Sequence, residues 1–178
     1  MKGIFWKEGE SFTNSMSLIV SLLVRYPNFA TIGLDPEQKS IQFTFVVARS
    51  LAPPEFALFE RKVRQSLEAH AELSGRTAYL IELKMSQQDG LSFLEIKRDI
   101  DSLLPEEISL LTALIDQEFD GELVCDQEET LEEEDRAIQE EMIERMLEDL
   151  RDSRQEKKLI GFREEGRVMV FNRASLHK

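Results

Sequence analysis

The stretch Ile41-Gln-Phe-Thr-Phe-Val-Val-Ala48 decides the fold class. Apolar residues occupy positions 41, 43, 45 and 47, and they alternate with Gln42, Thr44, Val46 and Ala48. Successive side chains of a strand point to opposite faces, so a period of two predicts a β-strand with one fully apolar face. The fold must therefore cover one face of a sheet.

Turn and helix signals lie on both sides of this strand. The segment Asp35–Lys39 places Asp before Pro, which favours a turn, and it predicts a β-hairpin from residues 28–34 and 41–48. After the hairpin, Pro53-Pro54 opens a helix, because proline is tolerated in a first helical turn. Gly75 is a suitable end for that helix.

The same order recurs along the chain. Residues 77–85 and 91–97 flank a turn at 86–90, and a helix follows from Pro105 to about Asp120. A first helix, up to Arg25, precedes both units, so the order is α-ββα-ββα. We predict an α+β domain over residues 1–121, in which the helices cover one face of an antiparallel sheet. Its expected core is Ile41, Phe43, Phe45, Val47, Phe59, Val63, Leu67, Ile81, Leu94, Leu111 and Leu114.

Charge divides the rest of the chain. The whole sequence has a net charge of −13, yet residues 118–156 alone hold 17 acidic and 4 basic residues, and residues 157–178 hold 6 basic and 2 acidic residues. Such a break near residue 120 indicates a boundary. The predicted organisation is a core domain at 1–121, an acidic linker and long helix at 122–156, and a basic β-hairpin tail at 157–178.

The acidic helix, expected over 130–156, carries a narrow apolar stripe. A capping box at Thr130 and Glu133 starts it, and acidic residues precede basic ones, as the helix dipole favours. An apolar stripe must be buried against something. The predicted partner-binding residues are Ile138, Met142, Ile143, Met146 and Leu150. We expect a homodimer of antiparallel helices; the alternative is a monomer whose helix folds back on its own sheet.

The predicted C-terminal hairpin combines basic and aromatic residues, which suits phosphate contact and base stacking. The possible nucleic-acid contacts are Lys157, Lys158, Arg163, Arg167 and Arg173, next to Phe162 and Phe171. The competing interpretation, which we favour, is that both phenylalanines face the core and that the basic residues offset the acidic helix.

Signals for catalysis and metal binding are weak. The run 126–135 lacks the central glycine of a calcium loop, and no glycine-rich phosphate loop occurs. His70 has no evident proton-transfer partner, and Cys125 has acidic neighbours that oppose a reactive thiolate. Glu82 and Glu95 form a possible carboxylate pair, although Lys84 and Lys97 are equally good partners for them. We therefore predict no catalytic residue, no cofactor and no metal.

These observations favour a non-catalytic, cytoplasmic interaction or regulatory protein that acts through its acidic helix. A basic protein is a possible partner, since an acidic helix can mimic nucleic acid. The alternative is a nucleic-acid-associated protein that uses the basic hairpin, and a hydrolase built from scattered carboxylates is a third class. The apolar run at 18–24 is too short to span a membrane, so no membrane association is expected.

Overall fold

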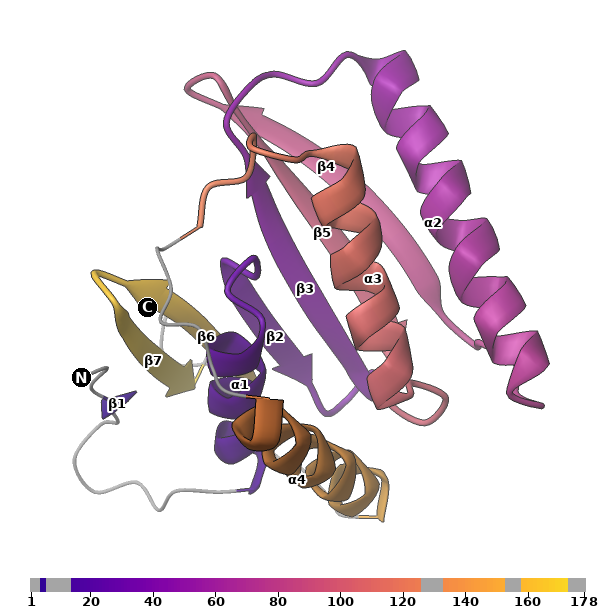
Figure 1. Cartoon of the computed structure of the whole chain (residues 1–178), viewed down its shortest axis with the longest axis vertical. Helices are drawn as coiled ribbons and strands as arrows, with labels where there is room; N and C mark the ends of the chain where they lie inside the picture. The colour runs from indigo at the N-terminus through magenta and orange to yellow at the C-terminus, as the bar shows by residue number, and fades with distance from the viewer. Residues whose placement is uncertain (1–3, 6–13, 126–132, 153–157, 173–178) are drawn as a thin grey trace.

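The computed structural model of the chain describes residues 4–5, 14–125, 133–152 and 158–172. Within these ranges it contains four helices and seven strands (Figure 1). The helices are α1 (Asn14–Arg25), α2 (Pro53–Leu73), α3 (Pro105–Glu118) and α4 (Glu133–Asp152). The strands are β1 (Ile4–Phe5), β2 (Thr31–Asp35), β3 (Ser40–Val47), β4 (Ile81–Gln88), β5 (Leu91–Asp99), β6 (Leu159–Glu164) and β7 (Arg167–Asn172).

All seven strands form one sheet, in the order β1-β7-β6-β2-β3-β5-β4. Every neighbouring pair is antiparallel except that the two-residue β1 runs parallel to β7. The two predicted hairpins, β2–β3 and β4–β5, meet where β3 pairs with β5. The α+β class, the α-ββα-ββα order and a hairpin after the last helix are thus confirmed.

The C-terminal hairpin is an integral part of this sheet. Strand β6 pairs with β2 along its length, from Thr31 opposite Phe162 to Leu34 opposite Leu159. The sheet therefore continues from the segment predicted as a core domain into the segment predicted as a tail. Residues far apart in sequence complete one layer.

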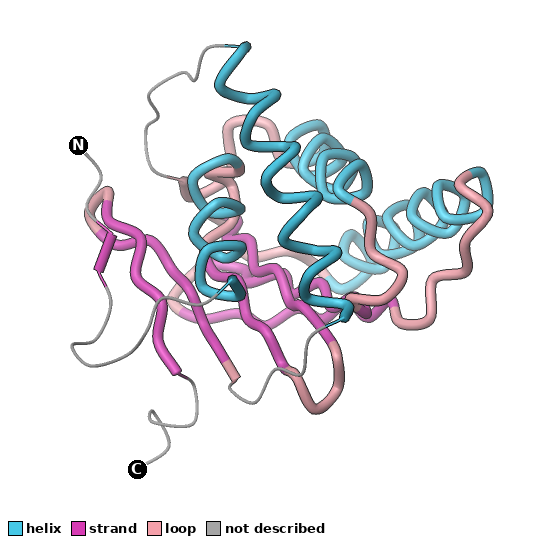
Figure 2. The backbone as a smooth tube through the Cα atoms, turned by 90° about the horizontal axis from the view of Figure 1, so that it is seen from below, coloured by secondary structure: helices cyan, strands magenta, loops and turns pink. Residues whose placement is uncertain are grey.

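The helices cover one face of the sheet, and none of the described helices lies on the other face, which we call the open face (Figure 2). Helix α1 lies over β2, β6 and β7, and α2 packs on α3 and β4. Their apolar sides meet the inward residues of the strands in one core. Ten of the eleven expected core residues are buried there, and Leu114 is partly buried against it.

Helix α4 adds a partial third layer. It packs along α1 and touches α3, and it does not rest on the sheet itself (Figure 1). Ile143 and Leu147 are fully enclosed at this contact. Because α1 is apolar on more than one side, it can contact the sheet on one side and α4 on the other.

A buried ionic network fixes the start of α3 to the end of β5. The Arg98 guanidinium, 1% exposed, donates two hydrogen bonds to the Glu107 carboxylate, both 2.8 Å long. It also donates to Asp99, which in turn accepts from the Ser102 and Leu80 backbone N–H groups at 2.8 and 3.0 Å. Such bidentate, charge-assisted bonds set geometry as well as energy, so the position of α3 is well determined.

Candidate functional site

The predicted partner-binding stripe divides between the inside and the outside of the molecule. Ile143, Met146 and Leu150 are buried in the chain's own core, against α1. Ile138 and Met142 remain 56% and 48% exposed. The expected alternative, a helix folded back on its own chain, describes this packing, except that α4 rests on α1 and not on the sheet.

The part of α4 that α1 leaves uncovered is an exposed acidic surface. We call it the acidic face, and it comprises Glu134, Asp135, Glu140, Glu141, Glu144, Glu148 and Asp149. Arg136 and Arg145 are the exposed basic residues within it; Arg145 lies 3.6 Å from Glu141, in a pair whose side chains are both more than half exposed. Exposed pairs of this kind are strongly screened by water. The acidic face therefore keeps a large negative potential.

The basic residues of the C-terminal hairpin do not gather into one patch. Lys158 lies 3.7 Å from Asp35 and 3.8 Å from Glu37. Arg163 donates a 2.8 Å hydrogen bond to the Pro27 carbonyl on the helix-covered side. Arg167 is exposed beside the β6–β7 turn, and Lys157 and Arg173 lie outside the described residues.

Phe162 and Phe171 do not face the core, which corrects the interpretation favoured from the sequence. Gly161 faces α1, so its neighbour Phe162 points to the open face of the sheet. The two rings stack there, with centroids 5.5 Å apart and planes 19° from parallel. Both side chains are half-buried.

The remaining chemical candidates are separated from one another. The β4–β5 register sets Glu82 opposite Lys97 and Lys84 opposite Glu95, so the two carboxylates do not form a pair. His70 is half-buried near the end of α2, and Cys125 is exposed. Among the described residues, no group of three or more His, Cys, Asp or Glu side chains is arranged to hold a metal ion.

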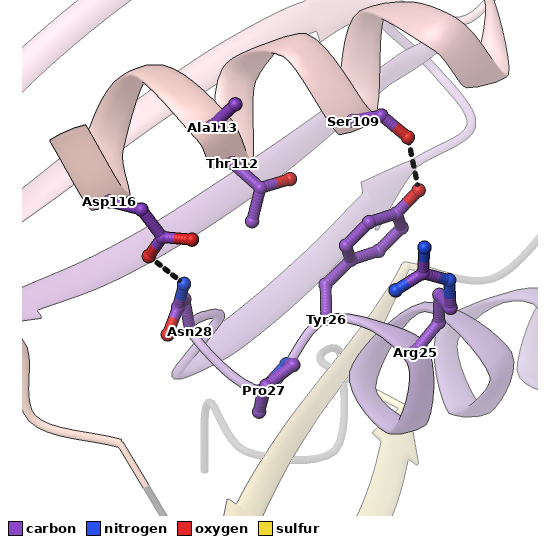
Figure 3. A pocket seen from close by; sticks show the side chains of 8 residues that line it. All are labelled: Arg25, Tyr26, Pro27, Asn28, Ser109, Thr112, Ala113 and Asp116. Carbon is purple, nitrogen blue, oxygen red and sulfur yellow. Dashed lines mark hydrogen bonds between the residues drawn. The ribbon is translucent and has the colours of Figure 1, made fainter. Parts of the chain in front are cut away.

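The structure reveals a hollow that the sequence did not predict. It has a volume of about 400 Å³ and lies between α3 and residues 25–28 at the end of α1 (Figure 3). Two hydrogen bonds cross it: the Tyr26 and Ser109 hydroxyl oxygens are 2.7 Å apart, and the Asn28 amide donates to the Asp116 carboxylate. Thr112 and Ala113 form the part of the wall between them.

The two charged residues of this hollow, Arg25 and Asp116, have different surroundings. The Arg25 guanidinium lies 4.8 Å from the centre of the Tyr26 ring and 3.0 Å from Glu140 of α4. Burial raises the pKa of Asp116; the Asn28 hydrogen bond lowers it, and the charge of Asp120 raises it. Burial also raises the pKa of Tyr26, against the lowering effects of Ser109 and Arg25. The Asp116 carboxylate is thus held in surroundings that disfavour its negative charge.

A second, smaller hollow adjoins the first. It has a volume of about 210 Å³ and is lined by Pro105, Glu106, Ser109, Glu140, Glu141 and Glu144. Ser109 borders both hollows, and the Arg25–Glu140 ion pair stands between them. We refer to the two adjoining hollows together as the α3 groove.

Sequence reasoning missed these residues for different reasons. Arg98 continues the inward period of Leu94 and Ile96, so a charged residue at a core position was a readable signal of a buried ion pair. Tyr26, Ser109 and Asp116 carried no such signal, because they come together only when α3 packs beside the end of α1.

Comparison with known proteins adds no relative: the chain matches no family model, no curated protein and no solved structure. In the part of the chain that the structure describes, no helix is both long and apolar enough to cross a membrane. Functional inference therefore rests on the geometry above.

Proposed function

We propose that the protein is a non-catalytic, cytoplasmic interaction protein that binds a basic protein partner through the acidic face of α4. The observation that carries this proposal is the arrangement of α4: Ile143, Met146 and Leu150 are buried against α1, while the carboxylates of the acidic face remain exposed. Because α4 packs on the domain through Ile143, Met146 and Leu150, it presents these charges together on one surface, which favours recognition over diffuse attraction.

Electrostatic complementarity supports a basic partner. A surface of one sign steers an oppositely charged protein during encounter and disfavours acidic competitors. Ile138 and Met142 lie exposed on the same helix and offer apolar contact at the edge of the acidic face. Methionine adapts its shape to different neighbours, so this edge suits a protein surface.

The test is quantitative cross-linked capture from the cells that produce the protein, using the whole chain as bait. The variant Glu148→Lys with Asp149→Lys reverses two charges of the acidic face near the end of α4. The control, Glu68→Lys with Glu72→Lys, reverses two exposed charges near the end of α2. Both variants carry the same change in net charge.

We expect a basic protein that is recovered with the wild type and with the α2 control, and that is lost with the α4 variant. The same protein, once purified, must bind the chain directly, and binding must weaken with salt because exposed charges are screened. The proposal is contradicted if recovery of the basic protein falls equally with the α4 variant and the α2 control, or if neither variant lowers it.

A homodimer is a less favoured use of the same helix. With Ile143, Met146 and Leu150 enclosed in the chain, contact between two α4 helices would rest on Ile138 and Met142. Two acidic faces would also be brought together. Light scattering decides between the two: a mass near 20.6 kDa at micromolar concentration excludes the dimer, and a dimer that persists in Ile138→Glu with Met142→Glu excludes this interface.

Nucleic-acid association is the second candidate, and one observation favours it. The stacked Phe162 and Phe171 rings lie on the open face of the sheet, where a base can stack on an aromatic side chain. Titration of labelled single-stranded DNA and RNA at low and moderate salt tests it. Binding that decreases in Phe171→Leu supports this candidate, whereas no binding at low salt removes it.

A further inference from the structure

The α3 groove has the charge of a site for cationic side chains. Its described lining contains the carboxylates of Glu106, Asp116, Glu140, Glu141 and Glu144. Among the described residues, Arg25 is the one cationic residue that lines either hollow. Asp116 accepts a hydrogen bond from the neutral Asn28 amide, and none of the ion pairs within the described residues includes it. The groove therefore has unneutralised negative charge at its Asp116 end.

Arg25 shows how this surface holds a guanidinium. Its planar group lies over the face of the Tyr26 ring, and the Glu140 carboxylate accepts its Nη2 hydrogen bond at 3.0 Å. An aromatic face together with a carboxylate is the environment that arginine prefers. The chain's own arginine thus occupies the middle of the groove in the manner expected of an external one.

The dimensions of the groove fit an extended peptide. Seven residues of α3 separate Ser109 from Asp116, which is a rise of about 10 Å. An extended chain advances about 3.3 Å per residue, so about three peptide residues run alongside this part of α3. The hollow at Asp116 has a volume of about 400 Å³, within the usual range of sites that accept organic groups.

We propose that the α3 groove receives an extended arginine- or lysine-containing segment of the basic partner, with one cationic side chain beside Asp116. This inference rests on the proposed function and names the place where the partner is anchored. The raised pKa of Asp116 agrees with it, because an incoming cation would relieve the cost of holding that carboxylate charged.

Fluorescence anisotropy with a labelled hexa-arginine peptide tests the inference on the whole chain at low salt. Asp116→Asn removes the charge and keeps an oxygen that can accept the Asn28 hydrogen bond. Asp89→Asn is the matched control: it makes the same chemical change in the β4–β5 turn, where the positive φ of 53° is one that asparagine tolerates.

We expect Asp116→Asn to weaken hexa-arginine binding about fivefold, the effect of losing an ion pair worth about 1 kcal/mol. The Asp89→Asn control should change affinity by less than about twofold. In a ¹H–¹⁵N correlation spectrum, the peptide should shift the amides of Ser109, Ala113 and Asp116. Unchanged thermal unfolding of Asp116→Asn would show that its fold is intact.

Equal affinities for both variants, or amide shifts confined to other parts of the molecule, would overturn the groove as the anchor. Failure of the inference is separable from failure of the proposed function. Both variants can be compared in the capture experiment. If the partner is lost with Glu148→Lys plus Asp149→Lys but is retained with Asp116→Asn, the acidic face is the binding surface and the α3 groove is not the anchor. If hexa-arginine fails to bind at low salt, the inference is wrong.

Discussion

Gly161 of β6 lies directly beneath Ile19 of α1, so closely that a Cβ atom on Gly161 would stand 2.1 Å from the Ile19 Cγ2 atom and 3.1 Å from Leu23. The absence of a side chain lets α1 approach the sheet at this point. Gly161→Ala should therefore destabilise the fold by about 1–3 kcal/mol, the usual cost of overpacking a core. Chemical denaturation measures the loss.

Gly33 provides the control for this prediction. It lies on the neighbouring strand β2, and an added Cβ would meet only the Leu159 carbonyl oxygen at 3.8 Å, an ordinary contact. Gly33→Ala should be neutral or slightly stabilising, because alanine reduces the freedom of the unfolded chain. If both substitutions destabilise equally, α1 does not approach the sheet as the structure shows.

The second prediction tests whether α4 belongs to the folded core. Leu147→Ala removes a fully buried side chain at the α1–α4 contact and should cost about 2–5 kcal/mol. Met142→Ala, five residues earlier on the exposed side of the same helix, should cost less than about 0.5 kcal/mol. Similar small losses for both variants would mean that α4 is not packed on α1.

The third prediction concerns the buried pair of Arg98 and Glu107. Arg98→Met leaves the Glu107 carboxylate buried without its partner and should destabilise the protein by about 3–5 kcal/mol. Arg98→Met combined with Glu107→Leu removes both charges and should recover part of that loss. A double variant less stable than Arg98→Met alone would contradict this account of the network.

The fourth prediction is a pH dependence centred on Asp99. Burial alone would raise the pKa of Asp99, but hydrogen bonds from Ser102 and Leu80, together with the charge of Arg98, hold it below its ordinary value. A depressed pKa adds stability that is fully present above the unfolded-state value of about 3.9 and is lost as pH falls through the folded-state value.

Comparison of the wild type with Asp99→Asn checks this dependence. The stability advantage of the wild type should be constant above about pH 5 and should shrink as the pH falls below the unfolded-state pKa of about 3.9. Denaturation curves at several pH values provide the measurement. A difference that does not vary with pH would show that the ionised carboxylate does not contribute to stability.

Local pattern was sufficient for much of the architecture. The alternation around Phe43 and Phe45 and the prolines at the starts of α2 and α3 predicted two ββα units, and the structure confirms them. These signals are reliable because they act between residues close in sequence, through strand periodicity and restricted backbone angles. The acidic helix was predicted in the same way, from a capping box at its start and from acidic residues that precede basic ones.

Tertiary structure decided everything that depends on which surfaces meet. The sequence pattern of α4 predicts an apolar side. It does not distinguish Ile143, which packs on α1, from Ile138, which remains exposed. The outward orientation of Phe162 follows from the close approach of α1 to Gly161, and the α3 groove from the pairing of Tyr26 with Ser109 across 83 residues. The hydrophobic effect is non-directional and favours the burial of an apolar face against any apolar surface. The sequence therefore shows that a face must be covered, whereas the tertiary structure decides which surface covers it.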